Sequence, residues 1–240
     1  MRTTIVIIPC FNEAERLDLR QFEALLAEPG LSLLFVDDGS SDSTLKVVEE
    51  FCRDTADADV LALMPNRGKA EAVRQGMLRA MQSNPEIIGF IDADLATPID
   101  EVLRLSRRAH EDVADAIIGS RIAYLGTDID RKEIRHLLGR VFATAASFTL
   151  GTRVYDTQCG AKFFRNSELL ARIVSEPFHS RWAFDVELLG RLLGEGATII
   201  EEPLRQWTDV PGSKIGFTSM VKAGLDLVQI RSHLVKRRNK

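Results

Sequence analysis

Two aspartates, Asp92 and Asp94, follow directly on the apolar run IIGFI at residues 87–91, and Pro98 breaks the stretch soon after. Such a run is typical of a buried strand, where a lone carboxylate is costly. Residues i and i+2 of an extended segment point to the same face, so we expect both carboxylates on one side. Because like charges repel unless a cation lies near them, this spacing predicts a bound divalent ion.

The ligand chemistry of this pair favours Mg²⁺ or Mn²⁺. Both ions take oxygen ligands and complete their coordination with water and phosphate oxygens when few carboxylates are available. A diphosphate is therefore the expected companion of the metal. The sequence has neither G-x-G-x-x-G after its first apolar run nor G-x-x-x-x-G-K-[ST] anywhere. Because both glycine-rich phosphate loops are missing, we expect metal, lysine and arginine to hold the diphosphate instead.

The elements that must position this pair are strands and helices that alternate through the first half of the chain. The expected strands are residues 4–9, 31–38, 60–64, 87–94 and 115–120, and the expected helices are residues 13–28, 43–53, 69–82 and 99–111. Asn12 and Ser43 are the expected N-caps of the first two helices. This order predicts β-α-β units and a mainly parallel α/β sheet flanked by helices.

Polar residues follow each expected strand. They are Asn12 and Glu13, Asp37 and Asp38, Asn66 to Lys69, Asp92 and Asp94, and Ser120 and Arg121. Loops are often polar without a functional reason, but the carboxyl ends of parallel strands meet at one edge, where ligands bind. Five polar clusters at one edge therefore favour a ligand site there.

After residue 121 the alternation fades. The remaining segments are a basic-then-apolar helix candidate at 130–150, a mixed stretch at 152–182, a helical pattern at 184–196, two short strands near 197–208 and a helix at 217–240 with a basic end. No low-complexity linker or internal repeat separates them from the first half. We therefore expect one domain over residues 1–240, with a nucleotide-binding half at 1–121 and a substrate-binding half at 122–240.

The overall composition narrows the class of protein. With 31 Lys and Arg against 35 Asp and Glu, the net charge of −4 gives no reason to expect nucleic acid as a partner. Cys10, Cys52 and Cys159 fit neither a disulfide framework nor a zinc pattern, which favours a reducing, cytoplasmic compartment. The first residues do not resemble a signal peptide, and no run reaches the ~18 apolar residues that span a bilayer.

A series of motifs resembles the inverting family 2 glycosyltransferases of GT-A fold, over residues 4–216. These motifs are VIIPCFNEAERL, LFVDDGSSDST, NRGKAEAVRQGM, IDADLATP, GSR, DTQCGAKFFRN, RWAFDVELL and VPGSKI. The first four are widespread in that family, whereas the later ones resemble the dolichyl-phosphate glucosyltransferases and related polyprenyl-phosphate sugar transferases. The resemblance implies that residues 1–121 bind a nucleotide sugar and that residues 122–240 bind the acceptor.

For the donor, the resemblance implies a set of binding residues. Pro9, Asn12 and Glu13 border the nucleotide, Asp37 lies near the base or ribose, and Lys69 lies near the diphosphate or the floor of the pocket. An acid at the end of the second strand is also expected, on the fold alone, to meet ribose hydroxyls. Asp38 stays open between a site role and stabilisation of the turn DGSSDST as a capping acid.

Around the reacting atoms, the resemblance gives Asp92 and Asp94 the metal and diphosphate role, with Asp94 as a direct ligand. Arg121 of GSR and Lys214 of GSK are implied to meet phosphates of the donor or acceptor, with an ordinary surface charge as the alternative for each. Asp156 of YDTQCG is expected to orient the acceptor phosphate or the sugar.

A general base is not required by every acceptor. A hydroxyl needs one, whereas a lipid monophosphate is already an anion at neutral pH because its second pKa is ~6. Asp185 of WAFDVELL opens an expected helix, where an acid has a capping explanation, so Asp156 is preferred over it. Cys159 has no histidine in its motif and is not expected as a nucleophile. Trp182 and Trp207 either stack on a sugar, lie at the membrane interface or pack in the core.

The function that the resemblance implies is the metal-dependent, inverting transfer of a hexose to a polyprenyl phosphate of dolichyl type at a membrane surface. Glucose from UDP-glucose is favoured, while GDP-mannose, another UDP-hexose and UDP-N-acetylhexosamine stay open as donors. One alternative is a soluble family 2 enzyme acting on a saccharide or small molecule. Another is a non-catalytic module that binds a nucleotide sugar or a lipid phosphate.

Two segments are candidates for the membrane contact. In residues 130–150 the groups expected at an anionic lipid surface are Arg131, Lys132 and Arg135, and those expected at the acyl boundary are Val141, Phe142 and Phe148. The basic end of the last helix is the second candidate, and an ordinary core helix with a solvated tail is the alternative. We expect a peripheral contact with the cytoplasmic face, made directly or through a membrane-protein partner. The oligomeric state is not predicted.

Overall fold

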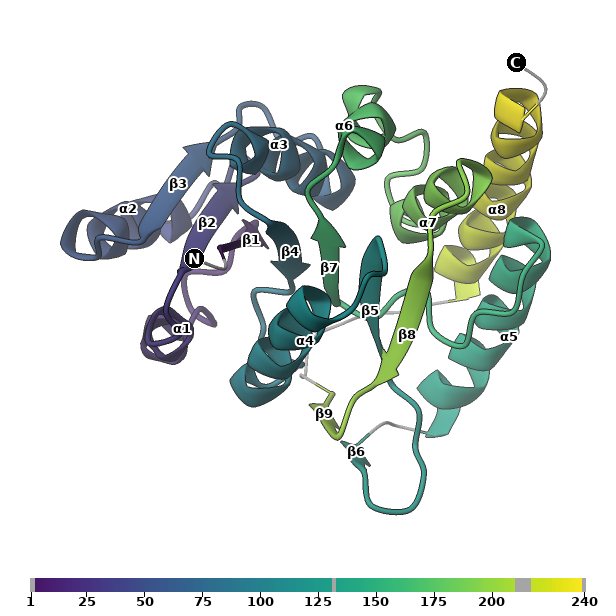
Figure 1. The fold of residues 1–240 in the computed structure, drawn as a ribbon, viewed down its shortest axis with the longest axis horizontal. Helices are drawn as coiled ribbons and strands as arrows, with labels where there is room; N and C mark the ends of the chain where they lie inside the picture. The colour runs from purple at the N-terminus through teal and green to yellow at the C-terminus, as the bar shows by residue number, and fades with distance from the viewer. Residues whose placement is uncertain (1–2, 131–132, 210–216, 239–240) are drawn as a thin grey trace.

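The computed structural model describes residues 3–130, 133–209 and 217–238, and its central feature is a seven-stranded sheet (Figure 1). The strand order is β3-β2-β1-β4-β7-β5-β8. These strands are β1 (Thr4–Cys10), β2 (Leu31–Asp37), β3 (Ala58–Ala62), β4 (Ile87–Ile91), β5 (Ala116–Ser120), β7 (Ala161–Arg165) and β8 (Ile199–Pro203). Neighbours run parallel except where β7 pairs with β4 and β5. The predicted mainly parallel sheet is confirmed.

Helices cover both faces of this sheet (Figure 1). Their bounds are α1 (Leu19–Leu26), α2 (Thr44–Asp54), α3 (Lys69–Met81), α4 (Ile99–Glu111), α5 (Glu133–Leu150), α6 (Glu168–Ser175), α7 (Phe184–Gly194) and α8 (Phe217–Arg238). Helices α1, α2 and α4 share one core cluster with the sheet, and α3, α6 and α7 share the other.

Strand β1 explains why both faces need a cover. Its side chains alternate between the two faces, so Val6 and Ile8 belong to one core cluster and Ile7 to the other. All three are fully buried. A continuous apolar run such as TIVII therefore belongs in the middle of a sheet that is covered on both sides.

The start of α1 differs from the prediction. The helix expected over 13–28 begins only at Leu19, where the Asp18 side chain caps it. Asn12 is not an N-cap, because its backbone is left-handed (φ 53°) and its Oδ1 accepts from the backbone N–H of Ser41. The loop that replaces the first turns of the expected helix keeps the residues after β1 at the carboxyl edge of the sheet.

The second helix starts where expected, but with a different cap. Ser43 occupies the N-cap position of α2 without a capping side-chain bond. Asp42 Oδ1 accepts from the backbone N–H of Thr44 instead, at 2.9 Å.

The stretch at 152–182, which gave no clear prediction, contains β7 and α6. Strand β7 is antiparallel and lies between β4 and β5 in the middle of the sheet. A lysine, Lys162, interrupts its apolar pattern, which conceals it in the sequence. The two strands expected near 197–208 are β8 and β9 (Gln206–Thr208), but β9 pairs with β6 (Asp128–Asp130) in a separate two-stranded sheet.

Helices α5 and α8 lie side by side beyond β8 (Figure 1). They pack on each other and on α7 through a third core cluster that includes Ala146, Leu150, Leu227 and Ile230. The helix expected at 130–150 is thus confirmed as α5, with its start at Glu133. Among the described helices, none combines the length and the apolar character that crossing a bilayer requires.

Candidate active site

The candidate residues of the first half meet at the carboxyl edge of the parallel strands. Asp37 is the last residue of β2, while Asp92 and Arg121 come directly after β4 and β5. Glu13 follows β1 in the loop before α1. These strands are parallel, so their carboxyl ends place the four residues along one edge of the sheet, as the sequence predicted.

Asp92 and Asp94 lie in a tight turn and not in an extended strand. Strand β4 ends at Ile91, and the backbone N–H of Leu95 donates to the carbonyl of Asp92 at 3.3 Å. Leu95 has a left-handed backbone (φ 51°), which is strained for a leucine and is often found at functional sites. The premise that strand alternation aligns the carboxylates is therefore wrong, because a turn brings them to the same edge.

The two carboxylates are nevertheless close enough to repel each other. Burial raises the pKa of Asp94, and the charge of Asp92 raises it further. Asp94 Oδ1 accepts from the backbone N–H of Ala96 at 3.1 Å, which fixes its direction. A cation beside this pair would relieve the repulsion.

Gly160 allows the turn to pack against β7. Its carbonyl accepts from the backbone N–H of Asp92 at 3.0 Å. A Cβ on residue 160 would lie 2.9 Å from Asp92 Oδ1 and closer still to Oδ2 and Cγ. Sequence reasoning missed this residue, and the glycine of the motif DTQCG was the available signal.

Lys69 is the first residue of α3, and its Nζ forms an ion pair with Asp92 Oδ1. Burial lowers the pKa of Lys69, but the carboxylates of Asp92, Asp185 and Asp94 outweigh it, so that the pKa is raised. The ammonium group therefore stays charged and provides positive charge at the edge where the metal and diphosphate are expected.

Asp38 holds the loop before Lys69. Its two carboxylate oxygens accept from the backbone N–H groups of Arg67 and Gly68, at 2.8 and 2.7 Å. Gly68 has a left-handed backbone (φ 92°) that favours glycine. The reading of Asp38 as a cap of its own turn is therefore wrong, since it orders the neighbouring loop instead.

Glu13 adds a third acid close to Asp94. The pKa of Glu13 is raised, mainly by burial and further by the charge of Asp94. Arg16 acts in the opposite direction, because its Nη2 donates to Glu13 Oε1 at 2.7 Å. Its Oε2 is buried and has no hydrogen-bond partner among the described residues. A buried acceptor without a partner is one that a bound water, ion or ligand donor would satisfy.

Asp37 shows the same feature at the end of β2. Its Oδ2 accepts from the backbone N–H of Ser40 at 3.0 Å, but the buried Oδ1 finds no partner in the described parts of the chain. A hydroxyl or N–H group of a bound nucleotide would satisfy it. Pro9 lies nearby in β1, paired with Val36, and the Asn12 side chain holds the loop at Ser41.

The described residues contain no cluster of three or more His, Cys, Asp or Glu side chains arranged around a metal. Asp92 and Asp94 alone offer few carboxylate oxygens. Such a donor set fits Mg²⁺ or Mn²⁺, which fill the rest of their coordination with water and phosphate oxygens. It does not fit a metal that needs a complete protein cage.

Arg121 and Asp156, which the sequence assigned to separate roles, form one bidentate pair. Arg121 donates from Nε to Asp156 Oδ2 at 2.6 Å and from Nη2 to Oδ1 at 2.8 Å. Burial lowers the pKa of Arg121, but the charge and hydrogen bonds of Asp156 outweigh the effect of burial, so the pKa is raised. Glu201 fixes the aspartate from behind, because its carboxylate accepts from the backbone N–H groups of Tyr155 and Asp156, both at 2.8 Å.

Asp185 is paired as well, with a lysine that sequence reasoning missed. Lys162 Nζ is fully buried and donates to Asp185 Oδ1 at 2.7 Å and to the carbonyl of Cys159. Asp185 does lie in the first turn of α7, but Lys162 uses its carboxylate. Capping alone therefore does not explain this acid.

Of the other residues named in the sequence analysis, some are buried in the core and one is exposed. Cys159 is fully buried, and burial raises its pKa to about 11, which disfavours a nucleophilic role, as predicted. Trp207 is buried in the core, whereas Trp182 is 40% exposed and packs edge-on against Phe142. Lys214 lies outside the described residues, as do the side chains of 131–136.

Comparisons with known proteins identify the family. The family model described as glycosyl transferase family 2 matches residues 5–171. The chain is 34% identical to a dolichyl-phosphate beta-glucosyltransferase of Homo sapiens, covering 94% of this chain and 74% of that protein. It is 33% identical to the protein of the same name from Saccharomyces cerevisiae, covering 94% and 73%.

Two solved structures share the fold at low identity. A mannosyltransferase from Pyrobaculum calidifontis, in complex with GDP-Man and Mn²⁺, superimposes with a TM-score of 0.67 at 18% identity, over 98% of this chain and 65% of that one. The chain thus spans slightly less than two thirds of that protein. A glucosyl-3-phosphoglycerate synthase from Mycobacterium tuberculosis, with Mn²⁺, UDP and phosphoglyceric acid, gives a TM-score of 0.67 at 19%, over 99% and 78%. The GT-A fold is confirmed, and the chain belongs to glycosyl transferase family 2.

Proposed function

We propose that the chain transfers a hexose, with glucose favoured, from a nucleotide sugar to a polyprenyl phosphate of dolichyl type. The observation that carries the donor side is the turn at Asp92 and Asp94 with the Lys69 ammonium against it. The acceptor side rests on the two curated relatives described above, which are both named dolichyl-phosphate beta-glucosyltransferase and match over most of the chain.

On the donor side each residue has a distinct task. Asp92 and Asp94 would hold Mg²⁺ or Mn²⁺, which neutralises charge on the departing nucleoside diphosphate when bound. Lys69 adds a second positive charge beside Asp92. The buried Oδ1 of Asp37 would accept a hydrogen bond from the nucleoside, with UDP-glucose as the favoured donor.

We infer an inverting reaction. An acceptor phosphate oxygen forms a bond to the anomeric carbon while the bond from that carbon to the diphosphate breaks, and the nucleoside diphosphate leaves with the electron pair. The acceptor is already an anion, so no proton has to be removed from it. The pair of Arg121 and Asp156 would orient the acceptor phosphate, with Asp156 holding the guanidinium in place.

The membrane face would be formed by α5 and α8. Exposed apolar side chains follow each other at helical spacing along both helices: Leu137, Val141 and Phe148 on α5, and Leu225, Val228 and Val235 on α8. Phe148 is 73% exposed and Leu225 is 67% exposed. Apolar stripes on adjacent helices support peripheral contact with a membrane. We propose its cytoplasmic face as the place of that contact. Phe142 was expected at the acyl boundary as well, but its ring packs against Trp182 instead.

The test is a transfer assay with purified protein, Mg²⁺ or Mn²⁺, a panel of nucleotide sugars and a short, water-soluble prenyl phosphate. Transfer should depend on metal, and Asp94→Asn should lose about 100-fold or more in rate while it stays folded. An α-linked donor should give a β-linked product by NMR of the anomeric proton. Near-normal rates with EDTA or with Asp94→Asn would exclude the metal role, and a retained anomer would exclude single displacement.

A flotation assay with anionic liposomes tests the membrane face. The wild type should float, and Val141→Glu with Phe148→Glu should reduce flotation without a change in transfer to the short prenyl phosphate. If the protein neither floats nor uses any prenyl phosphate, yet glycosylates a saccharide, the alternative of a soluble family 2 enzyme is correct.

A further inference from the structure

The segment between α6 and α7 reaches across to the loop that carries Lys69. Arg181 Nε donates to the carbonyl of Arg67 at 3.2 Å. A Cβ on Gly68 would lie 3.0 Å from Arg181 Nε and 3.3 Å from Nη2, so the guanidinium occupies the space that a side chain at 68 would need. Residues from the two halves of the chain therefore meet at the start of α3.

The loop that Arg181 contacts carries two further positive residues, Arg67 and Lys69. Lys69 is neutralised by Asp92, but in the described residues neither Arg67 nor Arg181 has an ion-pair partner. Both guanidinium groups are exposed, and Arg181 uses only its Nε. A charged, exposed guanidinium with two nitrogens that make no hydrogen bond to the described residues can bind an anion beside this loop.

The two neighbours of Arg181 in the chain, Ser180 and Trp182, anchor it to helices α8 and α5. Ser180 Oγ donates to Asp226 Oδ2 on α8 at 2.6 Å and accepts from the backbone N–H of Ala183 at 2.8 Å. Trp182 packs on Phe142 of α5. A guanidinium that is presented by an anchored segment, with two nitrogens left over, suits bidentate binding of a phosphate.

We propose that Arg181 is a further phosphate-binding residue of this site and that it contacts the diphosphate of the donor. The assignment rests on the proposed function. The donor is favoured over the acceptor phosphate because Lys69, the neighbour of Gly68, pairs with Asp92 of the metal turn. The acceptor phosphate is assigned to Arg121, which follows a different strand, β5.

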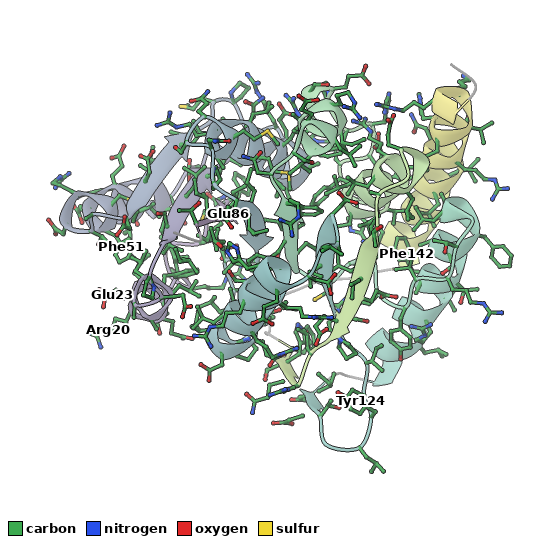
Figure 2. The ribbon with its side chains drawn as sticks, viewed as in Figure 1. Arg20, Glu23, Phe51, Glu86, Tyr124 and Phe142 are labelled. Carbon is green, nitrogen blue, oxygen red and sulfur yellow. The ribbon has the colours of Figure 1, made fainter. Side chains whose placement is uncertain are left out.

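The experiment measures nucleotide binding directly by calorimetry, with Mg²⁺ present, using UDP and GDP beside UMP and GMP. Arg181→Gln should raise the Kd of the nucleoside diphosphate that the wild type prefers by about 10- to 100-fold. It should change the Kd of the matching monophosphate by less than about threefold. Arg181→Lys should recover part of the loss because it keeps the charge. The matched control is Arg20→Gln, since Arg20 is also exposed and lies on α1, remote from α5 and Phe142 (Figure 2).

The outcomes separate this inference from the proposed function. If the wild type binds no nucleoside diphosphate, the proposed function fails. If the wild type binds but Arg181→Gln binds equally well, the phosphate role of Arg181 is wrong. If Arg181→Gln only raises the KM for the short prenyl phosphate, Arg181 binds the acceptor and its assignment to the donor is wrong. An equal loss for diphosphate and monophosphate would mean that Arg181 only holds the Arg67 loop.

Discussion

Replacing Gly160 by alanine tests the site through a residue that has no functional group of its own. The new Cβ would lie inside ordinary contact distance of three atoms of the Asp92 carboxyl group. The carbonyl of residue 160 also holds the backbone N–H of Asp92 at 3.0 Å. The substitution therefore has to displace the Asp92 carboxyl group, which also forms the ion pair with Lys69.

The size of the effect follows from these contacts. The Asp92 carboxylate must move by about 1 Å before the Cβ reaches 3.0 Å, below which real Cβ atoms are essentially never found. A misplacement of that size costs a rate factor of about 100, which corresponds to about 2.7 kcal/mol of transition-state stabilisation. Overpacking also costs about 1–3 kcal/mol of folding stability, or a fall in Tm of roughly 2–4 °C per kcal/mol for a chain of this size.

The assay is kcat/KM for hexose transfer together with thermal unfolding. The matched control is Gly224→Ala on α8, where a Cβ meets nothing within 4 Å and a helical alanine should stabilise slightly. That control should keep full activity. A Gly160→Ala protein with normal kcat/KM would refute the reasoning, because Asp92 would then tolerate displacement or have no role in transfer.

Two other predictions concern buried groups. Lys162→Met should lower the free energy of unfolding in urea titrations by about 3–5 kcal/mol, because it leaves Asp185 buried without its partner. The double variant Lys162→Met with Asp185→Leu should recover part of this loss. A double variant that is no more stable than the single variant would contradict the reasoning. In the folded protein at pH 7.5 the buried Cys10 and Cys159 should resist thiol reagents, because burial raises the pKa of both thiols, to about 11 for Cys159. Unfolded thiols ionise near pH 8.5, so stability should also fall as the pH rises above that value, and rapid labelling at pH 7.5 would count against the burial.

The regular part of the fold could be predicted because its signals are local. Helix α4 has the bounds 99–111 that the pattern predicts, since Pro98 precedes it and its apolar residues recur at helical spacing. Strand β7 could not be found this way. Its lysine is buried only because Asp185, 23 residues further along the chain, supplies the opposite charge. A partner at that distance leaves no mark in a local pattern.

The candidate site divides in the same way. The types of residue at the strand ends were predictable, because parallel strands bring their carboxyl ends to one edge. The pairings were not, because Arg121 and Asp156 are 35 positions apart and meet through a bidentate contact. Asp38 binds a loop about 30 positions away, although its neighbours suggested a local cap.

The place of β7 also has a consequence for how the chain acquires its shape during synthesis. Strands β4 and β5 do not touch in the sheet, because β7 lies between them and pairs with both. When residue 120 has just been made, β5 therefore has no neighbour to pair with, and β4 has an open edge. Both edges stay unsatisfied until residues 161–165 have been made and have left the ribosome. An exposed edge in a newly made chain invites pairing with other chains, so the interval between β5 and β7 is a period in which this protein needs protection from aggregation.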